Sequence, residues 1–209
     1  MREVVDGVFE LRLGVVNVHL VVTDDGVILV DTGLPGQAAA IEQAARPLGP
    51  VQAILLTHHH PDHAGGAADL RRRTGARLIA HAAEAPHLTG HFQAEEPEGR
   101  LRKFLFRRLE KIEPTKIDQL VGDRAEPLPD FTVIHTPGHT RGHLSFHLAR
   151  AGGVLFAGDA ATSRNGKVVG AVEKLAGFDA DHAVFGHGRP ISGEAAARFR
   201  EAAAAIKPE

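Results

Sequence analysis

Short runs of β-branched and other apolar residues alternate with polar turns through the first part of the chain. Val15–Val22 and Val27–Val30 are two such runs, and the four residues between them end in Asp25-Gly26. Because Asp-Gly between apolar runs is a strong hairpin signal, the sequence predicts two paired strands here. Val51–Leu56 is a short continuous apolar run, which is typical of a buried strand.

The segments around this buried strand alternate between helical and extended patterns. Apolar positions at helical spacing predict a helix over Gln37–Leu48. A second helix is expected from about Ala64 to Thr74, because Gly75 directly after it is a favourable residue for ending a helix. Arg77–Ala80 then has the pattern of another strand.

The second half of the chain returns to strands after a polar middle, about Ala82 to Pro114, that is expected to be helical. Four further strands are predicted, at residues 131–135, 144–148, 154–156 and 183–185. A C-terminal helix is expected after Ser192, a suitable capping residue. Each half thus runs from strands to helix, which favours an α+β (α/β) fold of two sheets packed face to face with helices outside. We expect residues 1–209 to form a single domain, with a helical insert at about 90–114.

Composition narrows the function classes. The 209 residues suit one sizeable core, and a formal net charge of −2 offers no basic field for nucleic acid. The absence of cysteine excludes disulfides, thiolate metal sites and a cysteine nucleophile. Neither the apolar run of a signal peptide nor a stretch of ~20 apolar residues is present, so we expect a cytoplasmic protein that acts on a small molecule and not on a membrane. A homodimer is compatible with these features, although nothing in the sequence decides it.

Histidine is the unusual component, with 14 residues in the chain. A single turn directly after the buried strand contains Thr57-His58-His59-His60-Pro61-Asp62-His63. His58 and His60 alternate along an extended chain and can point the same way, whereas Asp62 and His63 project as the chain turns. Imidazole nitrogens and carboxylate oxygens are ligands for Zn²⁺, Fe²⁺ and Mn²⁺. The turn therefore predicts a metal site rather than a solvated histidine-rich turn.

Three further strand ends each supply one residue of a metal-ligand type. These residues are His139 in Pro-Gly-His, Asp159 in Ala-Gly-Asp and His187 in Gly-His-Gly. Glycine lets neighbouring backbone segments approach closely, as a crowded site requires. Ligands that converge from several strand ends build a rigid site, so these three residues strengthen the prediction of a metal centre.

The order His-x-His-x-Asp-His, followed by separate His, Asp and His residues, resembles the metallo-β-lactamase superfamily over essentially the whole chain. Asp31 in Asp31-Thr32-Gly33 matches an early motif of that family, and the triple histidine followed by Gly65-Gly66 is most similar to its glyoxalase II branch. The resemblance implies a four-layer αβ/βα sandwich with the metals at one edge of the sheets. It implies one metal site of His58, His60 and His139, a second of Asp62, His63 and His187, and Asp159 as a bridge.

The same resemblance implies a metallo-hydrolase with two divalent ions, for which zinc is expected and iron or manganese is an alternative. A hydroxide held by both ions would attack a thioester, lactone, lactam or related ester, and Asp62 would bind one ion and orient the hydroxide. Such an enzyme would be similar to hydroxyacylglutathione hydrolases, lactonases or β-lactamases. The alternative is a glyoxalase II-like dioxygenase that oxidises a persulfide at one iron held by His58, His139 and Asp159. A non-catalytic metal-binding domain is a third interpretation.

Other residues are expected to support these ligands or to meet the substrate. By the resemblance, Asp31 hydrogen-bonds a ligating imidazole, and the alternative is that it only stabilises its own turn. His143 is expected to hydrogen-bond a ligand or the backbone rather than to bind metal. Phe104 and Phe106 in the helical insert, together with Arg141, are the candidates for substrate contact. The alternative for the insert is a solvated amphipathic helix, and for Arg141 a plain surface residue.

Overall fold

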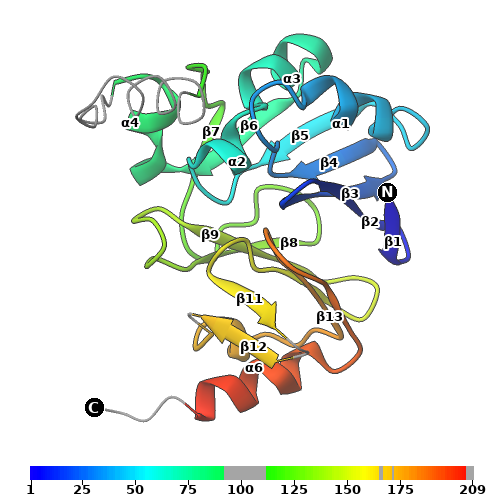
Figure 1. Cartoon of the computed structure of the whole chain (residues 1–209), viewed down its shortest axis with the longest axis vertical. Coiled ribbons are helices and arrows are strands. Elements are labelled where there is room, and N and C mark those ends of the chain that lie inside the picture. Colours follow the sequence, from blue (N-terminus) through cyan, green and yellow to red (C-terminus); the bar gives the residue numbers. More distant parts are fainter. Residues whose placement is uncertain (92–111, 165–166, 171, 206–209) are drawn as a thin grey trace.

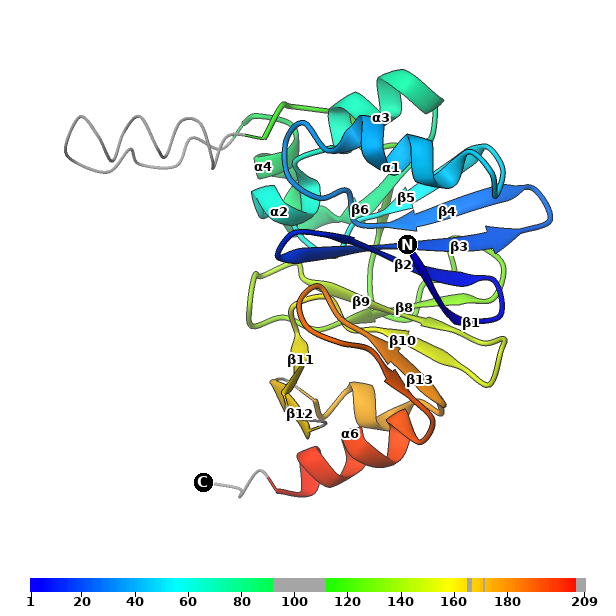
Figure 2. The ribbon, with the colours of Figure 1, turned by 45° about the vertical axis from the view of Figure 1, so that its right-hand side comes forward.

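Two mixed sheets pack face to face in this computed structural model, which describes residues 1–91, 112–164, 167–170 and 172–205. Helices α1 (Ala38–Ala45) and α3 (Ala67–Thr74) cover the outer side of one sheet, and α6 (Ala195–Ala204) covers the outer side of the other (Figures 1 and 2). The layer order is therefore helix, sheet, sheet, helix. This arrangement confirms the expected four-layer αβ/βα sandwich.

The first sheet contains seven strands that lie in chain order from edge to edge. They are β1 (Arg2–Val5), β2 (Val8–Leu13), β3 (Val16–Thr23), β4 (Gly26–Val30), β5 (Val51–Leu55), β6 (Arg77–His81) and β7 (Gln119–Val121). Strands β1 to β4 are antiparallel, whereas β4 to β7 are parallel. Parallel neighbours need long crossover connections, and α1 and α3 lie in two of these connections.

The second sheet has five strands in the order β14-β13-β10-β9-β8. They are β8 (Phe131–His135), β9 (Leu144–Leu148), β10 (Val154–Phe156), β13 (His182–Val184) and β14 (Ile191–Ser192). Within this sheet, β10 and β13 are the parallel pair. A separate hairpin is formed by β11 (Ala161–Arg164) and β12 (Lys167–Gly170). The short helix η2 (Leu175–Gly177) joins α6 on the outer side.

Buried apolar side chains fill the three spaces between the layers. On β5, Ile54 packs in the cluster beneath α1 and α3, whereas its neighbour Leu55 packs in the cluster between the sheets. Phe185 and Phe199 belong to the third cluster, between the second sheet and α6. Apart from the exposed Gln52, strand β5 is therefore buried on both faces, as its apolar run predicted.

Several boundaries differ from the sequence-based predictions. The helix expected from about Ala64 is two short helices, α2 (Pro61–Ala64) and α3, although α3 does end at Gly75 in the left-handed conformation (φ 74°). The prediction that Ser192 caps the C-terminal helix is wrong. Ser192 pairs with His182 in the sheet, and Glu194, in the left-handed conformation (φ 57°), precedes α6. Backbone pairing at the sheet edge thus uses the residue that the sequence assigns to the helix.

The polar middle of the chain is only partly described. It begins with two short helices, η1 (Ala82–Glu84) and α4 (Ala85–Leu88), as a helical pattern predicts. Most of the expected insert, including Phe104 and Phe106, falls on residues 92–111 and lies outside the described residues. Within the described ranges, no helix combines the length and the apolar character needed to cross a bilayer.

Candidate metal centre

Loops at one edge of the sandwich carry the residues of metal-ligand type. Asp31 follows β4 and His58 follows β5, and these are parallel neighbours in the first sheet. Asp159 follows β10 and His187 follows β13, the parallel pair of the second sheet. The carboxyl ends of parallel neighbours meet at one sheet edge, where α/β proteins commonly bind ligands. His139 joins them from the connection between β8 and β9.

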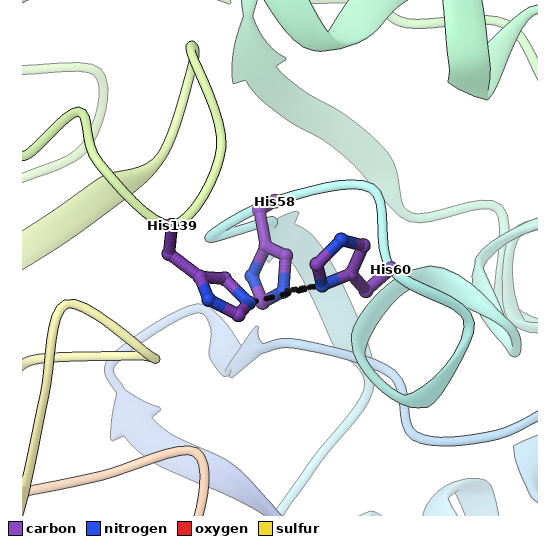
Figure 3. A group of neighbouring side chains, drawn as sticks. All are labelled: His58, His60 and His139. Carbon is purple, nitrogen blue, oxygen red and sulfur yellow. Dashed lines mark hydrogen bonds between the residues drawn. The ribbon is translucent and has the colours of Figure 1, made fainter.

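His58, His60 and His139 point their rings toward one another, although they come from two different loops (Figure 3). Nδ1 of His60 lies 3.0 Å from Nε2 of His58 and 2.9 Å from Nε2 of His139. These three residues are named the first ligand group. Three ring nitrogens at such distances repel one another through their lone pairs unless a proton or a cation lies among them.

Asp62, His63 and His187 form a second cluster, named the second ligand group. Nε2 of His187 lies 3.2 Å from Oδ2 of Asp62 and 3.4 Å from Nε2 of His63. Nε2 of His63 lies 3.6 Å from Oδ2 of Asp62. Within each group, the atoms that could bind a cation all lie within 4.8 Å of one another.

Asp159 lies between the two groups. Its Oδ2 is 3.5 Å from Nε2 of His139 in the first group and 3.4 Å from Nε2 of His187 in the second. Its Oδ1 is 3.4 Å from Nε2 of His63. The structure thus brings together all seven residues for which the sequence predicts metal binding.

Hydrogen bonds to the outer ring nitrogens orient the histidines of the second group. His63 Nδ1 lies 2.8 Å from Oδ2 of Asp31, and His187 Nδ1 lies 2.7 Å from the carbonyl oxygen of Val15. Because a carboxylate and a carbonyl only accept hydrogen bonds, each Nδ1 carries the proton. The Nε2 atoms of both rings therefore face the centre, where each can bind a metal ion in place of a proton.

Asp31 also reaches the first ligand group, through Thr57. The Thr57 backbone N–H donates to Oδ1 of Asp31 at 2.8 Å, and the Thr57 hydroxyl lies 2.9 Å from both carboxylate oxygens. When this hydroxyl donates to Asp31, its oxygen accepts from Nδ1 of His58 at 3.0 Å. The Nε2 atom of His58 is then left free. Asp31 is only 2% exposed, and its carboxylate contacts the candidate ligand His63 directly.

His143 supports the backbone next to Asp159. Its Nε2 accepts a hydrogen bond from the Asp159 backbone N–H at 3.0 Å, and its Nδ1 lies 2.8 Å from the Thr136 hydroxyl. The Thr136 hydroxyl also lies 3.0 Å from the Ser145 hydroxyl, which donates to the Ala157 carbonyl at 3.0 Å. This buried series of hydrogen bonds begins and ends on the loop that carries Asp159. Burial lowers the pKa of His143 to about 4, which keeps Nε2 available as an acceptor at neutral pH.

The electrostatics of the two ligand groups are opposite. Hydrogen bonds to Asp159 and Asp62 raise the pKa of His187 to about 11. Burial lowers the pKa of His63, but the Asp31 and Asp159 carboxylates outweigh it and raise that pKa to about 10. In the first group, burial and the neighbouring histidines lower the pKa of His58 and His60. The carboxylates thus draw positive charge to the second group, whereas His58 and His60 of the first group offer neutral imidazoles.

The donor set fits divalent metal ions. Oδ1 of Asp159 is buried without a hydrogen-bond partner. Burying a carboxylate oxygen in this way costs free energy unless a cation binds to it. Five histidines and two carboxylates, with no thiol in the chain, are suited to Zn²⁺, Fe²⁺ or Mn²⁺. Cations between these atoms would also remove the lone-pair repulsion of the first group.

Two other residues, Glu84 and Arg141, lie outside the seven predicted metal ligands. Glu84, which the sequence analysis does not single out, is 2% exposed and accepts hydrogen bonds from the loops that carry both parts of the first ligand group. The signal for it in the sequence is weak, because it is one carboxylate in a short alanine-rich segment. Arg141 is exposed, and its backbone carbonyl lies 3.0 Å from Nε2 of His135. Its expected contact with substrate stays a prediction.

The chain is similar in sequence to proteins of one superfamily. A sequence model of the metallo-beta-lactamase superfamily matches residues 11–193. The uncharacterized protein YobT of Bacillus subtilis is 35% identical over 158 residues, which cover 74% of this chain and 65% of YobT. A hydroxyacylglutathione hydrolase of Cereibacter sphaeroides is 33% identical over 149 residues, which cover 66% of this chain and 48% of that protein. The chain thus spans about half to two thirds of the length of these relatives.

The fold also has counterparts among solved structures. A metallo-β-lactamase from Cronobacter sakazakii superimposes with a TM-score of 0.71 at 24% identity, over 89% of this chain and 77% of that one. At this level of identity the similarity concerns the fold. It matches the four layers described above.

Proposed function

Because this chain belongs to the metallo-β-lactamase superfamily, we propose that it is a metal-dependent hydrolase of a small thioester, lactone, lactam or related ester. The observation that carries the proposal is the meeting of two ligand groups around Asp159, whose Oδ2 lies 3.5 Å from the first group and 3.4 Å from the second. We assign one divalent ion to each group, with Asp159 shared between them. Zinc is the metal that we expect.

Bound divalent ions would supply Lewis acidity, which polarises a substrate carbonyl and lowers the pKa of a coordinated water to about 7. The protein's own part is to turn the ligand nitrogens toward the metal. Asp31 and the Val15 carbonyl do this for His63 and His187 by accepting from Nδ1.

We assign Asp62 a second role, that of orienting the attacking water. Its side chain is 29% exposed, so water and substrate can reach it. The hydrogen bond with His187 is the largest of the effects that lower the pKa of Asp62. Asp62 is therefore ionised at neutral pH, and its carboxylate can accept a hydrogen bond from the attacking water and orient it.

Metal content is the first test of the proposed function. Close to two zinc ions per chain, with hydrolysis of a member of a thioester, lactone and lactam panel, is the expected result. Asp62→Ala should lower turnover strongly and leave the fold intact. As a control, His147→Ala removes a histidine whose ring contacts Asp179 and Phe178 rather than a ligand group, and should keep both metal and activity. A metal-free chain that hydrolyses the same substrates would contradict the proposal.

A single iron held by His58, His139 and Asp159 is the alternative. Two histidines and one carboxylate are a common ligand set for non-haem iron enzymes, and Asp159 lies 3.5 Å from His139. Persulfide-dependent O₂ uptake by a chain with close to one iron and little zinc would favour this dioxygenase over the hydrolase. Binding of metal without either activity would favour a non-catalytic domain.

A further inference from the structure

Two separate loops carry the first ligand group, and their relative position decides whether its three nitrogens meet. His58 and His60 lie on the loop between β5 and α2, whereas His139 lies on the loop between β8 and β9 (Figure 3). The two loops come from different sheets. A contact between the two loops is therefore needed to fix their relative position at the edge of the sandwich.

Glu84 contacts both loops at once. Its Oε2 accepts from the backbone N–H of His59 at 2.9 Å and from the Nδ1 atom of the same residue. Its Oε1 accepts from the Thr140 hydroxyl at 2.9 Å and from the Gly142 backbone N–H at 2.7 Å. One oxygen thus serves the His58–His60 loop and the other serves the His139 loop.

The surroundings of Glu84 show that the contact is tightly fitted. The side chain of Glu84 is 2% exposed, and burial raises its pKa, but the hydrogen bonds and charge of His59 together with the other donors outweigh burial and lower the pKa to about 2. A Cβ atom added at Gly142 would lie 2.6 Å from Oε1 of Glu84, so only glycine allows this close approach. The carboxylate is therefore ionised, buried and enclosed.

We propose that Glu84 is a positioning residue that clamps the two loops of the first ligand group and thereby sets the affinity of that group for its metal ion. Glu84 lies beside His59 and Thr140, which are the chain neighbours of the candidate ligands, and it acts through the backbone. This inference rests on the proposed metal centre, but it assigns a function to a residue outside the ligand set. The second ligand group, which Asp31 and the Val15 carbonyl orient, should not depend on Glu84.

Glu84→Gln is the sharpest substitution, because it keeps the size of the side chain. The carboxylate accepts a backbone N–H on each oxygen, and an amide can accept on only one side. Its NH₂ group must then face a donor on one of the two loops. Removal of residues that orient metal ligands commonly weakens metal affinity by about 10–100-fold, and we expect a loss in this range.

The experiment separates the two groups by using variants that each keep one of them. In a His187→Ala background the first group remains, and Glu84→Gln should weaken zinc binding at least about tenfold, measured by competition with a chromophoric chelator. In a His139→Ala background the second group remains, and Glu84→Gln should change zinc binding less than about twofold. Equal weakening in both backgrounds, or no weakening in the first, would overturn the proposal.

Two further variants distinguish a clamp from a general effect on folding. Glu10→Gln alters another buried carboxylate, which pairs with Arg2 on the first sheet, and should leave zinc affinity unchanged. Gly142→Ala keeps Glu84 but pushes its carboxylate, so it should weaken the first group in the same direction as Glu84→Gln. Unchanged affinity in Gly142→Ala would count against the clamp.

The failure of the proposed function would look different. A folded, unmodified chain that binds no divalent metal would overturn the metal centre and this inference with it. A chain that binds two metals, with Glu84→Gln binding both as tightly as before, would overturn the role of Glu84 alone.

Discussion

The first and second ligand groups contain three residues each, but the protein positions them by different means. In the second group, hydrogen bonds donated to Asp31 and to the Val15 carbonyl hold the imidazole rings of His63 and His187 directly. In the first group, Thr57 orients the ring of His58, and Glu84 joins the loops by their backbones. The geometry of the second ligand group is thus set by the orientation of its rings, and that of the first by the relative position of two loops.

The difference follows from where the ligands lie. His63 belongs to α2, which packs against the Asp31 loop, and the Thr32 backbone N–H donates to the His63 carbonyl at 2.7 Å. The backbone is already fixed there, so only the rings need support. Both groups join segments from two sheets. In the second group, Asn17 of β3 already links them, because its backbone N–H donates to the Gly186 carbonyl at 2.8 Å. In the first group, Glu84 makes the link between the loops. Rigid support of this kind is what a precise metal site requires.

Asp159→Ala is the substitution with the largest expected effect, because Asp159 lies against both groups. The change removes the shared carboxylate and leaves the two groups without a common ligand. We expect metal and activity to be lost together, with turnover reduced by more than about 100-fold. Elemental analysis and turnover on the same preparation would check this, and full activity in the variant would remove the two-metal interpretation.

Asp31→Asn should have the next largest effect, and it should fall mainly on the second group. When the amide oxygen keeps the hydrogen bond from the Thr57 backbone N–H, the NH₂ group faces Nδ1–H of His63, and the ring of His63 loses its acceptor. Zinc affinity of the second group should fall by about 10–100-fold, measured in the His139→Ala background. Asp130→Asn is a matched control, since both aspartates have left-handed backbones (φ 66° and 63°), which Asn tolerates, and Asp130 is exposed. Similar losses in the two variants would point to a backbone effect instead.

The remaining prediction concerns stability in acid rather than activity. The folded chain lowers the pKa of Glu84 from 4.5 to about 2, so the ionised carboxylate stabilises the fold above pH 4.5. This contribution is lost as the pH falls through about 2, because below that value Glu84 is protonated in both the folded and unfolded states. The shift corresponds to at most about 3 kcal/mol of unfolding free energy.

Urea unfolding of the metal-free chain and of Glu84→Gln measures this contribution. The stability difference between them should be largest near neutral pH and should shrink as the pH is lowered from about 5 to 3. A difference that stays constant over this range would show that ionisation of Glu84 does not stabilise the fold.

Much of the fold could be predicted because its signals are local. Strand β5 shows as a continuous apolar run, the end of α3 shows as Gly75, and the turn between β3 and β4 shows as Asp25-Gly26. The short strands β1, β7 and β14 were not predicted. They are sheet-edge strands, whose pairing depends on a partner elsewhere in the chain. Strand β14 contains Ser192, which pairs with His182 instead of capping the C-terminal helix.

Residue identity alone sets which chemistry the centre can offer. Histidine and aspartate occur at the spacings of a metal site, and cysteine does not occur at all, so the types of ligand are set by residue identity. The tertiary structure alone decided how those residues are held. Asp31 lies 26 residues from Thr57, and Glu84 lies 25 residues from His59 and 58 from Gly142, so their contacts exist only after the chain has folded. A hydrogen bond depends on the distance and direction between two atoms, and no local pattern of residues encodes either.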